Sequence, residues 1–160
     1  MCVVVLVVGV PQNACAQNLS YGSYTFLPST DDFTDEDRSA IATLDESREA
    51  GFGWKCMGDG LNVLYIFNKY MAGDSDGEVI VRFRVDKNPP SEQLYWSLSS
   101  DHTMAYMPME LVRAFTASAV AGSVVVFEVI DPIDGETKRH KFSLSGVTAA
   151  IKQLSCAAYN

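Results

Sequence analysis

The sequence predicts an α+β fold built mainly from an antiparallel β-sheet or β-sandwich, with two or three short helices, the last at the C-terminus. Three observations support this prediction. Short runs of β-branched and aromatic residues are separated by Gly, Pro and Asp-Gly turns. One run, 78–86, alternates apolar and polar side chains, which is typical of a strand with one solvated face. Two segments, 109–121 and 147–156, carry apolar residues at helical spacing.

The beginning of the chain has the pattern of a secretory signal. An apolar run over residues 2–10 is followed by a polar break containing Pro11 and by Ala14-Cys15-Ala16, a small-x-small cleavage pattern. The run is too short to span a bilayer. We therefore expect a signal peptide over residues 1–16 and a secreted protein, periplasmic or extracellular. A lipoprotein attached at Cys15 is the alternative.

The net charge excludes some kinds of partner, and the cysteine content predicts a disulfide. The net charge of −8 argues against nucleic acid or an anionic membrane surface as a partner, because both require clustered Lys and Arg. Cleavage after Ala16 leaves only Cys56 and Cys156, and an even pair in an exported chain predicts a disulfide. Two buried free thiols are the alternative.

The first part of the mature chain, 17–50, reads as an acidic N-terminal arm. Residues 18–27 are aromatic-rich and predict an edge strand that Pro28 ends. Acidic residues then precede Ile41 and Leu44, so a short helix with Thr34 as its N-cap is predicted; a solvated arm is the alternative.

Residues 51–160 predict a single β-rich domain. Two strands, 51–57 and 61–68, form a hairpin that carries Trp54 and Cys56. Later elements follow in order: strands at 78–86, 93–99 and 104–107, a helix at 109–121, a hairpin of 123–130 with 137–144, and a final helix at 147–156.

The predicted binding site lies on the strand 78–86. Arg82 and Arg84 stand on its solvated face, near Tyr95 or Trp96 if the next strand pairs with it. Such a face suits a carboxylate or an acidic partner surface, and aromatic rings including Trp54 suit sugar faces. Ordinary cross-strand pairing with acidic neighbours is the simpler interpretation.

Other patterns do not define a reactive site. The turns at 74–78 and 131–136 lack the spacing of a calcium loop, and the two Cys and two His residues lack the pairs that begin a zinc site. Ser99 to His102 contain nucleophile and base types in a row, without a nucleophile elbow. We expect no cofactor, no metal and no enzymatic activity.

Four segments together resemble a known family. Trp54 and Cys56 lead an apolar strand, VRFRVD spans 81–86, YWSLSSD spans 95–101, and FSLSGVTAAIKQLSC spans 142–156. This pattern resembles the VasI-type accessory proteins associated with bacterial type VI secretion. Its C-terminal part is similar to the invasion-associated locus B family of bacterial envelope proteins.

The resemblance implies a β-rich periplasmic or surface protein with no catalytic residues to carry over. Arg84 and Asp86 match an R-x-D strand of the VasI-type pattern, and Cys56 and Cys156 match its cysteines. We therefore expect a non-enzymatic, exported envelope protein that binds a protein partner and is associated with a secretion system. A small-ligand or carbohydrate-binding module that uses the arginine and aromatic face is the alternative.

Overall fold

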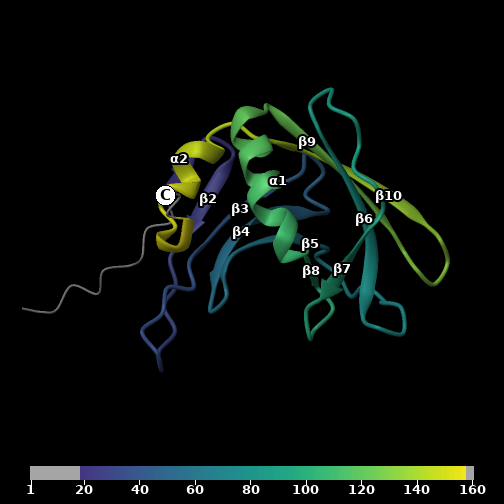
Figure 1. The fold of residues 1–160 in the computed structure, drawn as a ribbon, viewed down its shortest axis with the longest axis horizontal. Coiled ribbons are helices and arrows are strands. Elements are labelled where there is room, and N and C mark those ends of the chain that lie inside the picture. The colour runs from purple at the N-terminus through teal and green to yellow at the C-terminus, as the bar shows by residue number, and fades with distance from the viewer. Residues whose placement is uncertain (1–18, 158–160) are drawn as a thin grey trace, which may run out of the picture.

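The computed structural model describes residues 19–157 (Figure 1), and the predicted signal peptide with its cleavage site lies outside this range. The strands are β1 (Leu19–Tyr21), β2 (Tyr24–Leu27), β3 (Ala40–Leu44), β4 (Gly51–Met57), β5 (Gly60–Ile66), β6 (Glu78–Val85), β7 (Leu94–Leu98), β8 (Met104–Tyr106), β9 (Val124–Ile130) and β10 (Thr137–Ser143). The helices are α1 (Met109–Ala121), α2 (Val147–Ile151) and a 3₁₀ turn, η1 (Ser155–Ala157).

All ten strands form one open antiparallel sheet in the order β1-β2-β3-β4-β5-β8-β7-β6-β9-β10. The predicted antiparallel sheet and both predicted core hairpins, β4–β5 and β9–β10, are confirmed. The sandwich alternative is not confirmed, because the strands do not divide into two separate sheets.

Residues 19–50 are part of this sheet. Within the described residues, the edge strand predicted at 18–27 is instead the hairpin β1–β2, because Gly22 adopts a positive φ of 59° at the turn. The expected acidic arm therefore contributes three strands to the sheet, and Tyr24 of β2 and Ile41 of β3 are fully buried in the core.

The short helix predicted from Thr34 is wrong. The carboxylate of Asp31 accepts hydrogen bonds from the backbone N–H groups of Phe33 and Thr34, and it closes a turn there. The following residues then extend into β3, which pairs with β2 and β4. Long-range pairing therefore overrides the local helix signal.

Gly53 allows β3 and β4 to approach closely. A Cβ at this position would lie 2.0 Å from the carbonyl oxygen of Ile41, a distance that no side chain can accommodate. Only glycine fits at this position of β4, although a glycine inside a strand ordinarily weakens it.

The helix predicted at 109–121 is confirmed as α1, with Pro108 before it and Gly122 after it. The last predicted helix, 147–156, is too long: α2 ends at Ile151 and a turn leads into η1. Figure 1 shows α1 and α2 lying on the same side of the molecule, over strands of the N-terminal half of the sheet.

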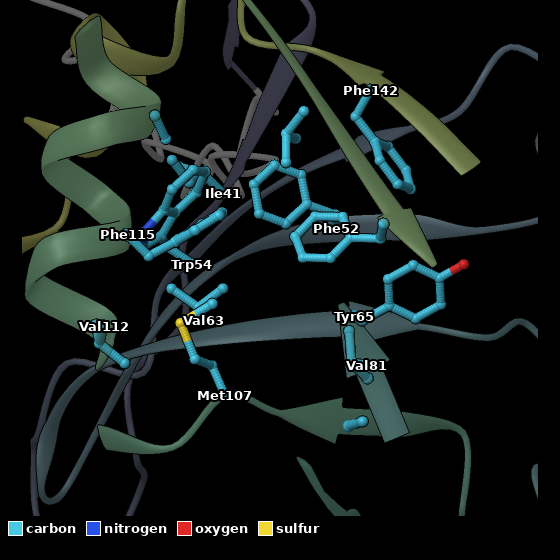
Figure 2. Close-up of a cluster of buried hydrophobic side chains, with 14 of the residues drawn as sticks. Ile41, Phe52, Trp54, Val63, Tyr65, Val81, Met107, Val112, Phe115 and Phe142 are labelled. Carbon is cyan, nitrogen blue, oxygen red and sulfur yellow. The ribbon is translucent and has the colours of Figure 1, made fainter. Parts of the chain in front are cut away.

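The core lies on one face of the sheet and is rich in aromatic rings (Figure 2). Phe52 of β4 packs against Phe127 of β9 at 5.0 Å and Phe142 of β10 at 5.5 Å, measured between ring centroids. Phe115 of α1 covers Phe52 and Trp54. Since β4 and β10 are far apart in the strand order, these contacts mean that the sheet curls around its own core.

The C-terminal segment is tied to this core by a covalent bond. Cys56 and Cys156 form the predicted disulfide, across a sequence separation of 100 residues. Beside it, Ser155 donates hydrogen bonds from its hydroxyl and its backbone N–H to the carboxylate of Asp37. Two early segments of the chain thereby hold η1 in place.

Candidate functional site

The predicted arginine residues lie on the outward face of the sheet, where three strands bring charged groups into one row. Arg82 of β6 is directly opposite Glu128 of β9, and Glu128 is directly opposite Arg139 of β10. Arg84 lies two residues further along β6, on the same face. We refer to Arg82, Arg84, Glu128 and Arg139 as the arginine face.

Glu128 neutralises part of this charge. Its carboxylate lies 2.5 Å from Nε of Arg139 and 3.5 Å from Nη1 of Arg82. The Glu128 side chain is only 16 % exposed, whereas the Arg139 side chain is 72 % exposed. The cross-strand pairing expected as the simpler interpretation is therefore present for Arg82, and one carboxylate is shared between two guanidinium groups.

Arg84 is held differently. Its Nε donates a hydrogen bond of 2.8 Å to the carbonyl oxygen of Asn88, which fixes the start of the guanidinium group. Its neighbour across the strand is the apolar Val126, and no described carboxylate lies within 4.0 Å of it. The outer nitrogens of Arg84 are therefore available for a bidentate contact with an external carboxylate.

A depression of about 340 Å³ lies between these side chains. Its charged lining consists of three arginines and Glu128, and Phe83, Pro90 and Val126 supply apolar lining. This basic surface belongs to a chain whose net charge is −8. The contrast favours an acidic ligand at this position, because opposite charge steers association.

The predicted aromatic residues do not all reach this face. Tyr95 pairs with Ile80 on the outward side and is 55 % exposed, but it does not line the depression. Trp96 pairs with Val79 on the core side, and both Trp96 and Trp54 are fully buried. The proposed role of the two tryptophans in binding is therefore corrected: alternation along the strands directs both indoles into the core.

Trp54 has a structural partner inside the core. Its indole Nε1 donates a hydrogen bond of 2.9 Å to the hydroxyl of Thr116 on α1, and that hydroxyl donates to the carbonyl of Val112. Trp54 thus links β4 to the helix.

The sequence analysis missed Glu128 and Arg139. Both occupy outward positions of the hairpin β9–β10, where Arg139 alternates with the inward-facing Lys138 and His140. The alternation was visible in the sequence, but the pairing of β9 with β6 was not.

The acidic turns use their carboxylates to close the backbone. Asp74 accepts hydrogen bonds from the N–H groups of Asp76 and Glu78, and Asp131 accepts one from Ile133. Within residues 19–157, no group of three His, Cys, Asp or Glu side chains is arranged to hold a metal ion.

The segment from Ser99 to His102 is a polar turn. The Ser99 hydroxyl donates to the carboxylate of Asp101 at 2.6 Å, and Nδ1 of His102 lies 2.9 Å from the carbonyl oxygen of Met71. The imidazole also stacks on Tyr70. Serine and histidine therefore have separate partners in this turn.

An open antiparallel sheet that curls around an aromatic core under one main helix defines the structural class of this chain. Its fold is similar to that of the crystal structure of invasion associated protein B from Bartonella henselae, with a TM-score of 0.60. The two sequences are 11 % identical, and the similarity covers 86 % of this chain and 94 % of that one. The predicted resemblance to the invasion-associated locus B family is thus confirmed for the fold.

Sequence comparisons add no further relationship, since no family model and no curated protein matches the chain. The resemblance to VasI-type proteins is not shown by these comparisons. Among the described residues, no helix is both long enough and apolar enough to cross a membrane.

Proposed function

We propose that this chain is an exported protein of a bacterial envelope that binds an acidic partner protein through the arginine face. The observation that carries this proposal is the concentration of three arginines around one depression on a strongly acidic chain. Arginine is favoured at protein interfaces because its planar guanidinium group forms paired hydrogen bonds with carboxylates.

Export is supported by two features. The disulfide between Cys56 and Cys156 is of a kind that persists in oxidising compartments. The similar fold belongs to a protein whose name associates it with invasion. A secretion-associated role rests on the sequence resemblance to VasI-type proteins alone.

Arg84 is the residue whose substitution tests the site most directly. Because no described carboxylate pairs with it, replacing it leaves the Glu128 pairs of the folded protein intact.

A small acidic ligand is the second candidate, since the depression of about 340 Å³ has apolar lining beside its guanidinium groups.

The experiment compares the mature chain with Arg84→Glu by cross-linking and capture from the envelope fraction of its own cells, with each captured protein identified by mass spectrometry. Arg113→Glu is the matched control, because Arg113 is an exposed arginine of α1 away from this face. We expect one acidic protein to be captured by the wild type and by Arg113→Glu and to be lost with Arg84→Glu. Raising the salt concentration should weaken capture as well. Capture of the same proteins by all three chains would refute the proposed site.

A further inference from the structure

A second cavity lies on the opposite, core-facing side of the sheet. It has a volume of about 320 Å³ and opens between β5, with the loop that follows it, and the hairpin β9–β10. Phe67, Met71 and Val129 line it and are each at least nine-tenths buried. We refer to this cavity as the mouth pocket. Its volume is at the lower end of the range for small-molecule sites.

Strand alternation places polar residues of β10 at the mouth pocket. Lys138 pairs with Val129 and His140 pairs with Phe127, so both face inward with these core residues, whereas Arg139 faces outward. The mouth pocket and the arginine face therefore use alternate residues of the same strand and lie on opposite faces of the sheet.

The lining of the mouth pocket includes a hydrogen-bonded pair. The hydroxyl of Tyr65 and Nδ1 of His140 are hydrogen-bonded to each other. The His140 side chain is only 13 % exposed, and its Nε2 lies 3.9 Å from the carboxylate of Glu49. Burial raises the pKa of Tyr65, which keeps its hydroxyl protonated. The pair presents a polar group of defined orientation to the cavity.

Two lysines also line the mouth pocket. Lys69 comes from the loop after β5 and Lys138 from β10, and the proximity of Lys138 lowers the pKa of Lys69. Lys138 is paired with Glu136 at 3.5 Å, whereas Lys69 has no described carboxylate within 4.0 Å. The exposed ammonium group of Lys69 is therefore open to an external anion, with Lys138 in the same lining.

We propose that the mouth pocket binds a small organic monocarboxylate with an apolar body, its carboxylate between Lys69 and Lys138 and its body against Phe67, Met71 and Val129. Buried apolar lining with a few convergent polar groups is the usual composition of such a site. The two lysines outnumber the single carboxylate of the lining, Glu49, so the pocket favours an anion, and the apolar lining excludes a hydrated inorganic ion. This site is independent of the arginine face.

The test uses the full mature chain with phenylacetate and hexanoate as probes. Binding is followed by calorimetry and by the NMR resonances of His140. The neutral analogue phenylacetamide tests the need for charge, and inorganic phosphate tests the need for an apolar body. We expect both carboxylates to bind, and phenylacetamide and phosphate to bind at least about tenfold more weakly, as expected when a charged contact is lost.

Variants then locate the site. Lys69→Gln combined with Lys138→Gln should weaken phenylacetate binding by about tenfold or more, since both ammonium groups are lost. Lys152→Gln, at an exposed lysine next to α2, is the matched control and should bind as the wild type does. Failure of both carboxylates to bind at about 10 mM, equal binding of phenylacetamide or phosphate, or unchanged binding by the double variant would overturn the proposal. The ligand comparison uses only wild-type protein, so it stands even if a variant does not fold.

Discussion

Reducing the disulfide between Cys56 and Cys156 should lower the free energy of unfolding by about 4 to 5 kcal/mol. The bond closes a loop with a sequence separation of 100 residues. In the chain-entropy model, releasing a loop of that length increases the entropy of the unfolded chain by an amount equivalent to about 4.7 kcal/mol at 25 °C. Small domains are stabilised by about 5 to 15 kcal/mol in total, so the loss would be a large part of the stability.

The folded state should survive reduction. Cys56 is 1 % exposed and remains packed in β4, and the hydrogen bonds from Ser155 to Asp37 still hold η1 next to it. The effect should therefore come mainly from the unfolded chain, which also exposes more surface when it is no longer cross-linked. Reduction should accordingly increase the dependence of unfolding on urea concentration.

The measurement is urea unfolding with and without a phosphine reductant, followed by tryptophan fluorescence. Both tryptophans, Trp54 and Trp96, are fully buried and therefore report on the core. The double variant Cys56→Ala, Cys156→Ala is the control, and its free energy of unfolding should be the same with and without the reductant. If the reduced wild type, with its free thiols verified by alkylation, unfolds within about 1 kcal/mol of the oxidised protein, the loop-closure reasoning is wrong.

Two further changes test the packing of the fold. Thr116→Val should destabilise the protein by about 1 to 3 kcal/mol in urea unfolding, because it leaves the buried indole N–H of Trp54 without its acceptor. Burial raises the pKa of Asp37, but hydrogen bonds from Ser155 and Ser39 outweigh it and lower the pKa to about 2. A lowered folded-state pKa means that this stabilisation is complete above the unfolded value near 4 and is lost as the pH falls toward 2. After allowance for solvent screening, we expect Asp37→Asn to remove about 1 kcal/mol of the stability difference between pH 5 and pH 2.

Each change has a matched control. Thr116→Ser keeps the hydroxyl acceptor and should recover most of the stability lost in Thr116→Val. Asp32→Asn removes an exposed carboxylate from the same acidic loop as Asp37 and should leave the stability difference between the two pH values nearly unchanged. Equal losses for Thr116→Ser and Thr116→Val would mean that packing, and not the hydrogen bond, is responsible. A wild-type-like pH profile for Asp37→Asn would show that its hydrogen bonds do not contribute.

Several elements could be predicted because their signals are local. The helix α1 has Pro108 before it, Gly122 after it and an apolar stripe between them, and its bounds follow from these features alone. The strand β3 could not be predicted in this way. The acidic residues that precede it, in the segment 31–37, favour a helix N-terminus. Only pairing with β2 and β4 makes the extended conformation more stable.

The same division applies to the candidate sites. Alternation along β6 was enough to place Arg82 and Arg84 on the solvated face, and the two remaining cysteines were enough to predict their bond. Only the tertiary structure brought Glu128 and Arg139 to Arg82, buried the two tryptophans and placed Lys69 and Lys138 in the lining of one pocket. A strand's own sequence specifies which side chains face the core. It does not specify which distant strand will become its neighbour, because that choice is made by the packing of the whole core.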